Sequence, residues 1–284
     1  MGVLQAVIDD SGRGQGSPLV LGGCILPVDG WVAFTDQWKA ILDEPPAIQY
    51  LKMKEAWGFN GQFRKFNIRE RDAKVWRFVS VLLLHKPYGL RAIVDCDSYR
   101  KIFRGRVGKE LDSPTFMASL EAVNMVVRCQ ILGDLPSDAP VKFVFDEQGK
   151  ESDMFLYAWS EHMPRPKDAR MNALVPTCPT IEDDKTFLPL QAADFLVWHY
   201  RQELLARKQG TSPKSPFWDA LKILPLVESD LDEERLSKLM ATLNRVADED
   251  GCIFEYQLLD VEPKRMRKKM AQRKAIGRTR RGSR

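Results

Sequence analysis

The sequence has few of the side chains that form disulfides or bind soft metals. Its five cysteines lie at least 33 residues apart, so no Cys-x-x-Cys pair occurs, and its three histidines are not at ligand spacing from one another. A disulfide framework and a structural zinc site are therefore not expected. Any metal bound by this chain should be a hard ion with oxygen ligands, such as Mg²⁺ or Mn²⁺.

Long hydrophobic runs are also lacking. A membrane span needs about 18 consecutive apolar residues, and the most apolar stretch, Val79 to Leu84, has a third of that length. Asp9 and Asp10 interrupt any secretory leader, and Ala6 stands where myristoylation requires Ser or Thr. The composition, with 44% hydrophobic and 29% charged residues, is that of a soluble globular protein. We expect a cytoplasmic protein with no membrane partner.

Positive charge is concentrated at the C-terminus. The last 22 residues, 263–284, contain 11 Lys or Arg and no acidic residue, although the net charge of the whole chain is only +4. Because this tail has too few apolar residues to build a core, it should be disordered and should attract polyanions. Nucleic acid is the expected partner of such a tail. The alternative is a solvated terminus with no dedicated partner.

Short apolar runs that alternate with helical periodicity predict a mixed α/β sheet. The runs at 3–9 and 19–26 are separated by a glycine-rich loop at 11–17, which predicts a β-hairpin. Further strands are expected at 90–95, 141–145 and 173–181, and helices at 31–42, 70–86, from 113 onward, 151–162 and 189–208. Because strands alternate with helices, the helices should cover the faces of the sheet.

The chain is expected to contain one main domain and a C-terminal addition. The stretch Gln-Gly-Thr-Ser-Pro at 209–213 has the composition of a linker. We therefore expect the main domain at 1–209, and a helical extension that ends in a strand at 210–262. The disordered basic tail should occupy 263–284.

Three aspartates stand in apolar surroundings, where a charged side chain is costly. Asp9 closes the first apolar run, Asp146 closes the run that begins at Val141, and Asp194 lies inside the helical pattern at 189–208. A buried carboxylate is destabilising unless it is paired or binds a metal. If the three converge, a divalent cation would relieve their mutual repulsion. They are therefore the candidate catalytic residues and metal ligands.

Each aspartate also has an ordinary structural explanation. Asp9 could form a turn before Ser-Gly, and Asp146 could belong to a turn or cap a helix. Asp194 could be paired with a lysine or an arginine in a buried salt bridge. Other acidic residues are also candidates for the site. They are Asp95, at the end of another expected strand, and the acidic pair at 183–184.

Three motifs, in this order, resemble those of the bacterial and phage family called domain of unknown function 3800. They are Ile-Asp-Asp-Ser-Gly at 8–12, Phe-Asp-Glu at 145–147, and Asp-Lys at 184–185 followed by Leu-Gln-Ala-Ala-Asp at 190–194. The family usually has Asp-Glu-Ser-Gly in the first motif, Asp-Arg in the middle one and Leu-Gln-x-Ala-Asp-Leu in the last. The resemblance covers roughly residues 5–205.

The resemblance implies an RNase H-like α/β fold and a metal-dependent nuclease. In that fold, acids from the first strand, a later strand and a C-terminal helix meet at two metal ions. The matching motifs give these roles to Asp9, Asp146 and Asp194, and the topology of the fold leaves Asp95 as an alternative middle acid. Glu147 stands where the family more often has arginine, so the middle motif is the least typical of the three.

The expected function is hydrolysis of nucleic-acid phosphodiesters with two Mg²⁺ or Mn²⁺ ions. A rival interpretation is a non-catalytic nucleic-acid-binding or adaptor protein on an RNase H-like scaffold. In that case the acids would be vestigial or salt-bridged, and the basic tail would carry the function. A third possibility is an enzyme that transfers phosphoryl groups to or from a small molecule with the same acids.

Overall fold

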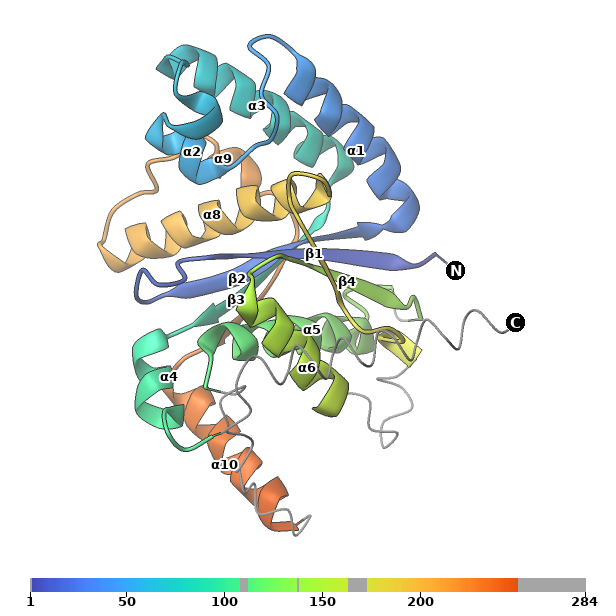
Figure 1. The fold of residues 1–284 in the computed structure, drawn as a ribbon, viewed down its shortest axis with the longest axis vertical. Helices are drawn as coiled ribbons and strands as arrows, with labels where there is room; N and C mark the ends of the chain where they lie inside the picture. The colour runs from blue at the N-terminus through green and yellow to red at the C-terminus, as the bar shows by residue number, and fades with distance from the viewer. Residues whose placement is uncertain (1, 108–111, 137, 163–172, 250–284) are drawn as a thin grey trace.

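A six-stranded mixed sheet forms the centre of the protein (Figure 1). The computed structural model describes residues 2–107, 112–136, 138–162 and 173–249. The strands lie in the spatial order β5-β4-β1-β2-β3-β6. Their bounds are β1 (Leu4–Ser11), β2 (Leu19–Pro27), β3 (Tyr88–Val94), β4 (Val141–Asp146), β5 (Thr180–Glu182) and β6 (Leu226–Leu231).

The directions of the strands bring the carboxyl ends of three of them together at one end of the sheet. β1, β2 and β3 form an antiparallel meander, which confirms the expected opening hairpin. On the other side of β1, β4 pairs parallel with β1 and β5 pairs parallel with β4. The carboxyl ends of β1, β4 and β5 therefore lie side by side, and the polar residues that follow these strands lie close to one another.

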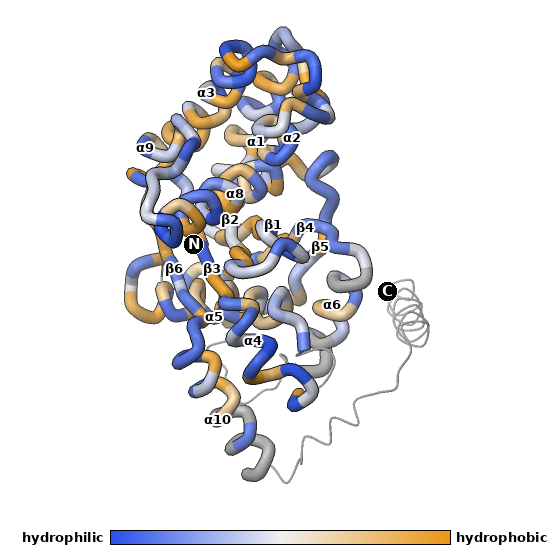
Figure 2. Tube along the Cα trace, turned by 90° about the vertical axis from the view of Figure 1, so that its left-hand side faces the viewer, coloured by the Kyte–Doolittle hydropathy of each residue, from blue (hydrophilic) through white to orange (hydrophobic). Residues whose placement is uncertain are grey.

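Helices cover both faces of the sheet, as the alternation of elements predicts (Figures 1 and 2). One face carries α1 (Val28–Asp43), α2 (Met53–Gly58), the 3₁₀ turn η1 (Gly61–Phe63), α3 (Ile68–His85), α8 (Pro189–Lys208) and α9 (Trp218–Leu221). The opposite face carries α4 (Cys96–Phe103), α5 (Pro114–Leu132), α6 (Lys150–His162) and α10 (Glu233–Glu249). The protein is therefore a three-layer α/β structure.

Alternation along the strands builds two separate cores. In β1, Ala6 and Ile8 point into the core beneath α5, whereas Val7 points into the core beneath α8. The hydropathy colouring in Figure 2 shows the apolar segments gathered on and around the sheet. Because each face of the sheet has its own core, the face from which an aspartate emerges decides which helices it meets.

Helix α8 lies unusually close to the sheet. It packs across β1 and β2, and β2 contributes Gly22 and Gly23 at this crossing. A Cβ atom built on Gly23 would lie 2.0 Å from the carbonyl oxygen of Val7 and 2.9 Å from Cβ of Ala193. Glycine at this position lets α8 approach the sheet, and Asp194 follows Ala193 directly.

The strands β5 and β6 differ from the expectation. β5 covers only residues 180–182, so it begins seven residues later than the strand expected at 173–181, because Pro176 and Pro179 precede it and it lies at the sheet edge. β6 was not expected, and it pairs parallel with β3, so the chain beyond 210 contributes to the same sheet. The strand expected at 252–259 and the basic tail at 263–284 lie outside the described residues.

Candidate active site

Asp9 and Asp146 emerge side by side from neighbouring parallel strands. Ile8 pairs with Phe145 in the β1–β4 register, so Asp9 and Asp146 take the next position on each strand. Two positions earlier on each strand, Val7 and Val144 point into the core beneath α8. Because side chains alternate along a strand, both carboxylates point toward the same face. Asp9 is buried, with 5% of its surface exposed, and its Oδ1 accepts a hydrogen bond of 2.7 Å from the backbone N–H of Asp10.

A third carboxylate, Asp184, joins them from the edge strand. Asp146 pairs with Glu182 in the β4–β5 register, and the chain then enters the turn that leads into α8. The backbone N–H groups of Thr186 and Phe187 donate to the carbonyl of Asp183, which forms this turn. Asp184 is only 3% exposed. The sequence motifs contained this residue, but it was not among the predicted ligands.

Asp194 reaches the site from α8, in which it follows the buried Gln191. Its Oδ2 accepts a hydrogen bond of 2.8 Å from the backbone N–H of Met53, the first residue of α2. Gln191 Oε1 accepts from Trp38 Nε1 at 3.0 Å and from the Leu51 N–H at 3.1 Å. These bonds tie α1 and the segment before α2 to the helix that carries Asp194.

Gln191 also connects the helix with the β5 side of the site. Its Nε2 donates to the backbone carbonyl of Asp184 at 2.8 Å. This amide is fully buried and its oxygen and nitrogen are both hydrogen-bonded. The glutamine of the Leu-Gln-Ala-Ala-Asp motif therefore has a structural role, because it holds Asp184 and Asp194 on one framework.

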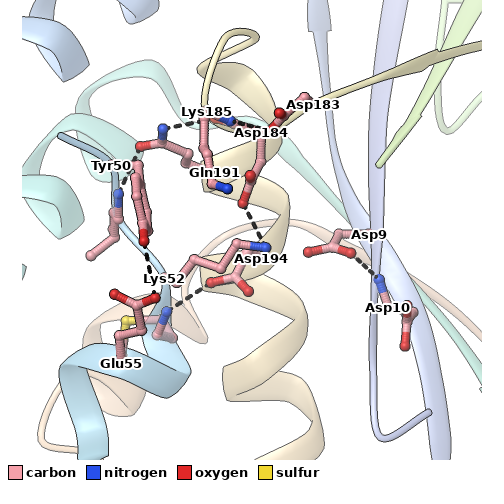
Figure 3. A network of polar contacts seen from close by, with 12 residues as sticks. Asp9, Asp10, Tyr50, Lys52, Glu55, Asp183, Asp184, Lys185, Gln191 and Asp194 are labelled. Carbon is pink, nitrogen blue, oxygen red and sulfur yellow. Dashed lines mark hydrogen bonds and ion pairs between the residues drawn. The ribbon is translucent and has the colours of Figure 1, made fainter. Parts of the chain in front are cut away.

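A lysine lies among the four carboxylates. Lys52 Nζ is 2.8 Å from Asp184 Oδ2, and Figure 3 shows its side chain between Asp184 and Asp194, with the Asp9 carboxylate directed toward the same region. Asp184 Oδ2 is buried and has this ammonium as its charge partner. The salt-bridge alternative considered for Asp194 thus has a specific cation nearby, whose direct ion pair is with Asp184.

The electrostatics show how closely the carboxylates are grouped. Burial, followed by repulsion from Asp194 and Asp146, raises the pKa of Asp9 well above its ordinary value. Burial raises the pKa of both Asp146 and Asp194 to about 6, although Lys52 opposes the shift in each case. The pKa of the Lys52 ammonium is itself raised, because the attraction of Asp184, Asp194 and Asp146 outweighs its burial.

Two other acidic candidates have different surroundings. Asp10 leaves β1 on the opposite face, where Gln148 Nε2 donates to its Oδ1 at 2.7 Å. Asp95 is the N-cap of α4, and its two oxygens accept hydrogen bonds from Ser17 Oγ and Ser98 Oγ at 2.9 Å each. β3, which Asp95 follows, is separated from β1 by β2. The structure thus brings Asp146, and not Asp95, beside Asp9.

The donor set has the chemistry of a hard cation site, but its ligand atoms are not assembled. Four carboxylates supply oxygen ligands only, as Mg²⁺ and Mn²⁺ prefer. In the described part of the chain, however, no group of three or more His, Cys, Asp or Glu side chains is arranged to hold a metal ion. The Lys52 ammonium lies among the carboxylates instead.

A pocket borders the same end of β4 on the other face of the sheet. It is lined by Asp146, Gln148 and Ser152 and by aromatic side chains of α5, β4 and α6. The rings of Phe145 and Phe155 lie 4.8 Å apart there. A ligand in this pocket would meet hydroxyl groups and aromatic surface beside the carboxyl end of β4.

The raised pKa values predict that the metal-free protein loses stability as the pH rises. Asp146 and Asp194 have pKa values near 6 in the folded protein, against about 3.9 for an unfolded aspartate. Between these values the folded state binds more protons, so the free energy of unfolding should fall as the pH rises toward 7. Each shift of two units corresponds to about 2–3 kcal/mol. Urea unfolding in EDTA from pH 5 to 8 measures this, and Asp194→Asn should flatten the slope. An identical slope in the variant would contradict the assignment.

Comparison with known proteins adds no relative to this picture. No protein-family model matches the chain, and neither the curated proteins nor the solved structures contain a significant match. Among the described residues, no helix combines the length and apolar character needed to cross a membrane.

Proposed function

We propose that this protein is a metal-dependent nuclease with an RNase H-like domain. The observation that carries the proposal is the convergence of Asp9, Asp146 and Asp184 at the ends of three neighbouring parallel strands, opposite Asp194 on α8. Buried carboxylates that repel one another destabilise a fold, and such groups persist at functional sites. Three of them, Asp9, Asp184 and Asp194, belong to the motifs that resemble the first and last motifs of the family described above.

The strand arrangement supports the RNase H-like assignment. An antiparallel meander of three strands is extended beyond β1 by two parallel strands, and the helix that follows them carries an acid. On the side of β1 away from the meander lies β4, which supports Asp146, rather than Asp95, as the middle acid. β6 is an addition on the far edge of the sheet.

The residues have separable roles in the proposed chemistry. Bound Mg²⁺ or Mn²⁺ ions would supply an activated water and would stabilise the leaving oxygen of a phosphodiester. Asp9 is repelled by both Asp194 and Asp146, so it is the proposed shared ligand. Asp146 and Asp194 would each complete one ion site, and Asp184 would add a fourth carboxylate beside Asp146. No histidine is required, which agrees with a chain that has only three.

Nucleic acid is the proposed substrate because its phosphodiester backbone could interact both with the carboxylate cluster and with the basic tail. The acids would hold the cations at the scissile phosphate, and the tail at 263–284 would bind the polyanion without reading its sequence. Lys52 favours the adaptor alternative, because its ammonium pairs with Asp184 and so gives the acids a positively charged partner without any metal.

Full-length protein and a protein ending at residue 262 separate these possibilities. Both should cleave a panel of single- and double-stranded DNA and RNA with Mg²⁺ or Mn²⁺ at saturating substrate, because all proposed ligands precede the tail. Deletion should weaken binding and flatten the dependence of log affinity on log salt, because fewer counterions are released. No cleavage by either protein, with binding lost on deletion, would favour the adaptor. An unchanged salt slope would remove the tail from the binding surface.

A further inference from the structure

The backbone around Lys52 is held in place independently of the Lys52 side chain. The N–H groups of the residues on each side are fixed to α8, that of Leu51 to Gln191 and that of Met53 to Asp194. The side chains of Leu51 and Met53 are fully buried. The Lys52 side chain is 32% exposed and reaches the carboxylates through four methylene groups. The ammonium can therefore leave the cluster by rotation of its own side chain without displacement of α2.

The ammonium lies close to several negative charges. It is 2.8 Å from Asp184 Oδ2, and its attraction extends to Asp194 and Asp146. Asp184 Oδ2 is buried and has the Lys52 ammonium as its charge partner, so a divalent cation could use this oxygen only at the expense of that ion pair. A divalent cation that used this oxygen would lie next to the ammonium, and the two positive charges would repel each other.

We propose that Lys52 is a built-in counterion that occupies the carboxylate cluster in the metal-free protein and competes with the divalent cation for it. This inference rests on the proposed function, because it concerns the same four carboxylates. The lysine stabilises the fold while the cations are absent, and it sets the cation concentration at which they can bind. Lys52 is a positioning residue in this account, since it acts through the carboxylates.

Binding of Mn²⁺ measured by calorimetry on the full-length protein tests the proposal without an activity assay. Lys52→Met keeps the length of the side chain and removes its charge, and it should bind Mn²⁺ at least about tenfold more tightly than the wild type. The metal-free Lys52→Met protein should also have a lower Tm at pH 8, and Mn²⁺ should raise that Tm by more than it raises the wild-type value.

Two further variants control for charge and for shape. Lys185→Met removes a lysine next to Asp184 in the sequence, but its Nζ lies 5.5 Å from the centre of the Tyr50 ring and outside the cluster. Its Mn²⁺ affinity should stay within about twofold of the wild type. Lys52→Arg keeps the positive charge and should also bind Mn²⁺ about as the wild type does, since competition depends on that charge.

The outcomes separate this inference from the proposed function. If the wild type binds Mn²⁺ and Lys52→Met binds it equally or more weakly, Lys52 is an ordinary salt bridge and the inference is overturned while the metal site stands. If neither protein binds Mn²⁺, the proposed metal-dependent function is overturned, and the inference with it. Binding by Lys52→Met alone would support strong competition. Should Lys52→Met fail to fold, Lys52→Gln provides the same comparison.

Discussion

Asp9→Asn is expected to abolish divalent-dependent nuclease activity while the protein remains folded. Asparagine preserves the shape of the side chain and can still accept the hydrogen bond from the Asp10 N–H. It removes the charge that the proposed shared ligand supplies, and the loss of such a group should lower kcat at least about a hundredfold. The measurement is single-turnover cleavage with Mg²⁺ and with Mn²⁺, together with the Tm in EDTA.

The same substitution should not destabilise the metal-free protein. Asp9 is buried, and its pKa is raised by burial and by repulsion from Asp194 and Asp146. A neutral amide relieves both effects, so the Tm at neutral pH should be unchanged or higher. A large loss of Tm would show instead that the carboxylate has a structural partner.

Asp10→Asn is the matched control for this experiment. Asp10 is the next residue of β1 and has the same charge, but its side chain leaves the opposite face and accepts from Gln148. Its replacement should change cleavage by only a few-fold. If the two variants lost activity equally, the face of the sheet from which the carboxylate emerges would not matter for cleavage. The proposed ligand set would then be wrong.

Much of the fold could be predicted from local sequence signals. Period-two and period-3.6 patterns are local properties, so most strands and the helices α1, α3, α5, α6 and α8 lie within a few residues of their expected ranges. Ser113 caps α5, and Pro114 follows it, as their order in the sequence indicates. β6 was missed because Leu-Val-Glu-Ser-Asp-Leu at 226–231 has only a weak apolar pattern, and its edge position needs no more.

The candidate site required information that local patterns do not contain. Asp9, Asp146 and Asp194 stand out because each interrupts or ends an apolar run. Asp184 follows a strand of three residues, and only the β4–β5 register places it beside Asp146. Lys52 reaches the acids through hydrogen bonds to α8, about 140 positions later in the chain. Such contacts depend on tertiary packing and leave little trace in the local sequence. The polar Gln191, which precedes Asp194 within the same motif, was the one local indication of them.

Gly23→Ala is expected to be the most destabilising single-methyl substitution near the site. The added Cβ would lie 2.0 Å from the Val7 carbonyl oxygen and 2.9 Å from Cβ of Ala193. The first contact is with the backbone of a neighbouring strand, which cannot move without disturbing the β1–β2 ladder. Overpacking at a buried position costs about 1–3 kcal/mol or more. For a protein of this size we expect the Tm to fall by about 10 °C.

The consequence for the site distinguishes Gly23 from an ordinary core position. The new methyl group would press on Ala193, so α8 should move away from β2 and carry Asp194 away from Asp9. The folded fraction of Gly23→Ala at low temperature should therefore gain less Tm from Mn²⁺ than the wild type gains. Gly30→Ala in α1 is the control, because its Cβ would meet only Pro27 and Leu26, at ordinary contact distances of 3.8 and 3.9 Å. That change should be neutral or stabilising by up to about 1 kcal/mol. If Gly23→Ala lost stability but kept the full gain from Mn²⁺, the close packing of α8 would serve the fold alone and not the placement of Asp194.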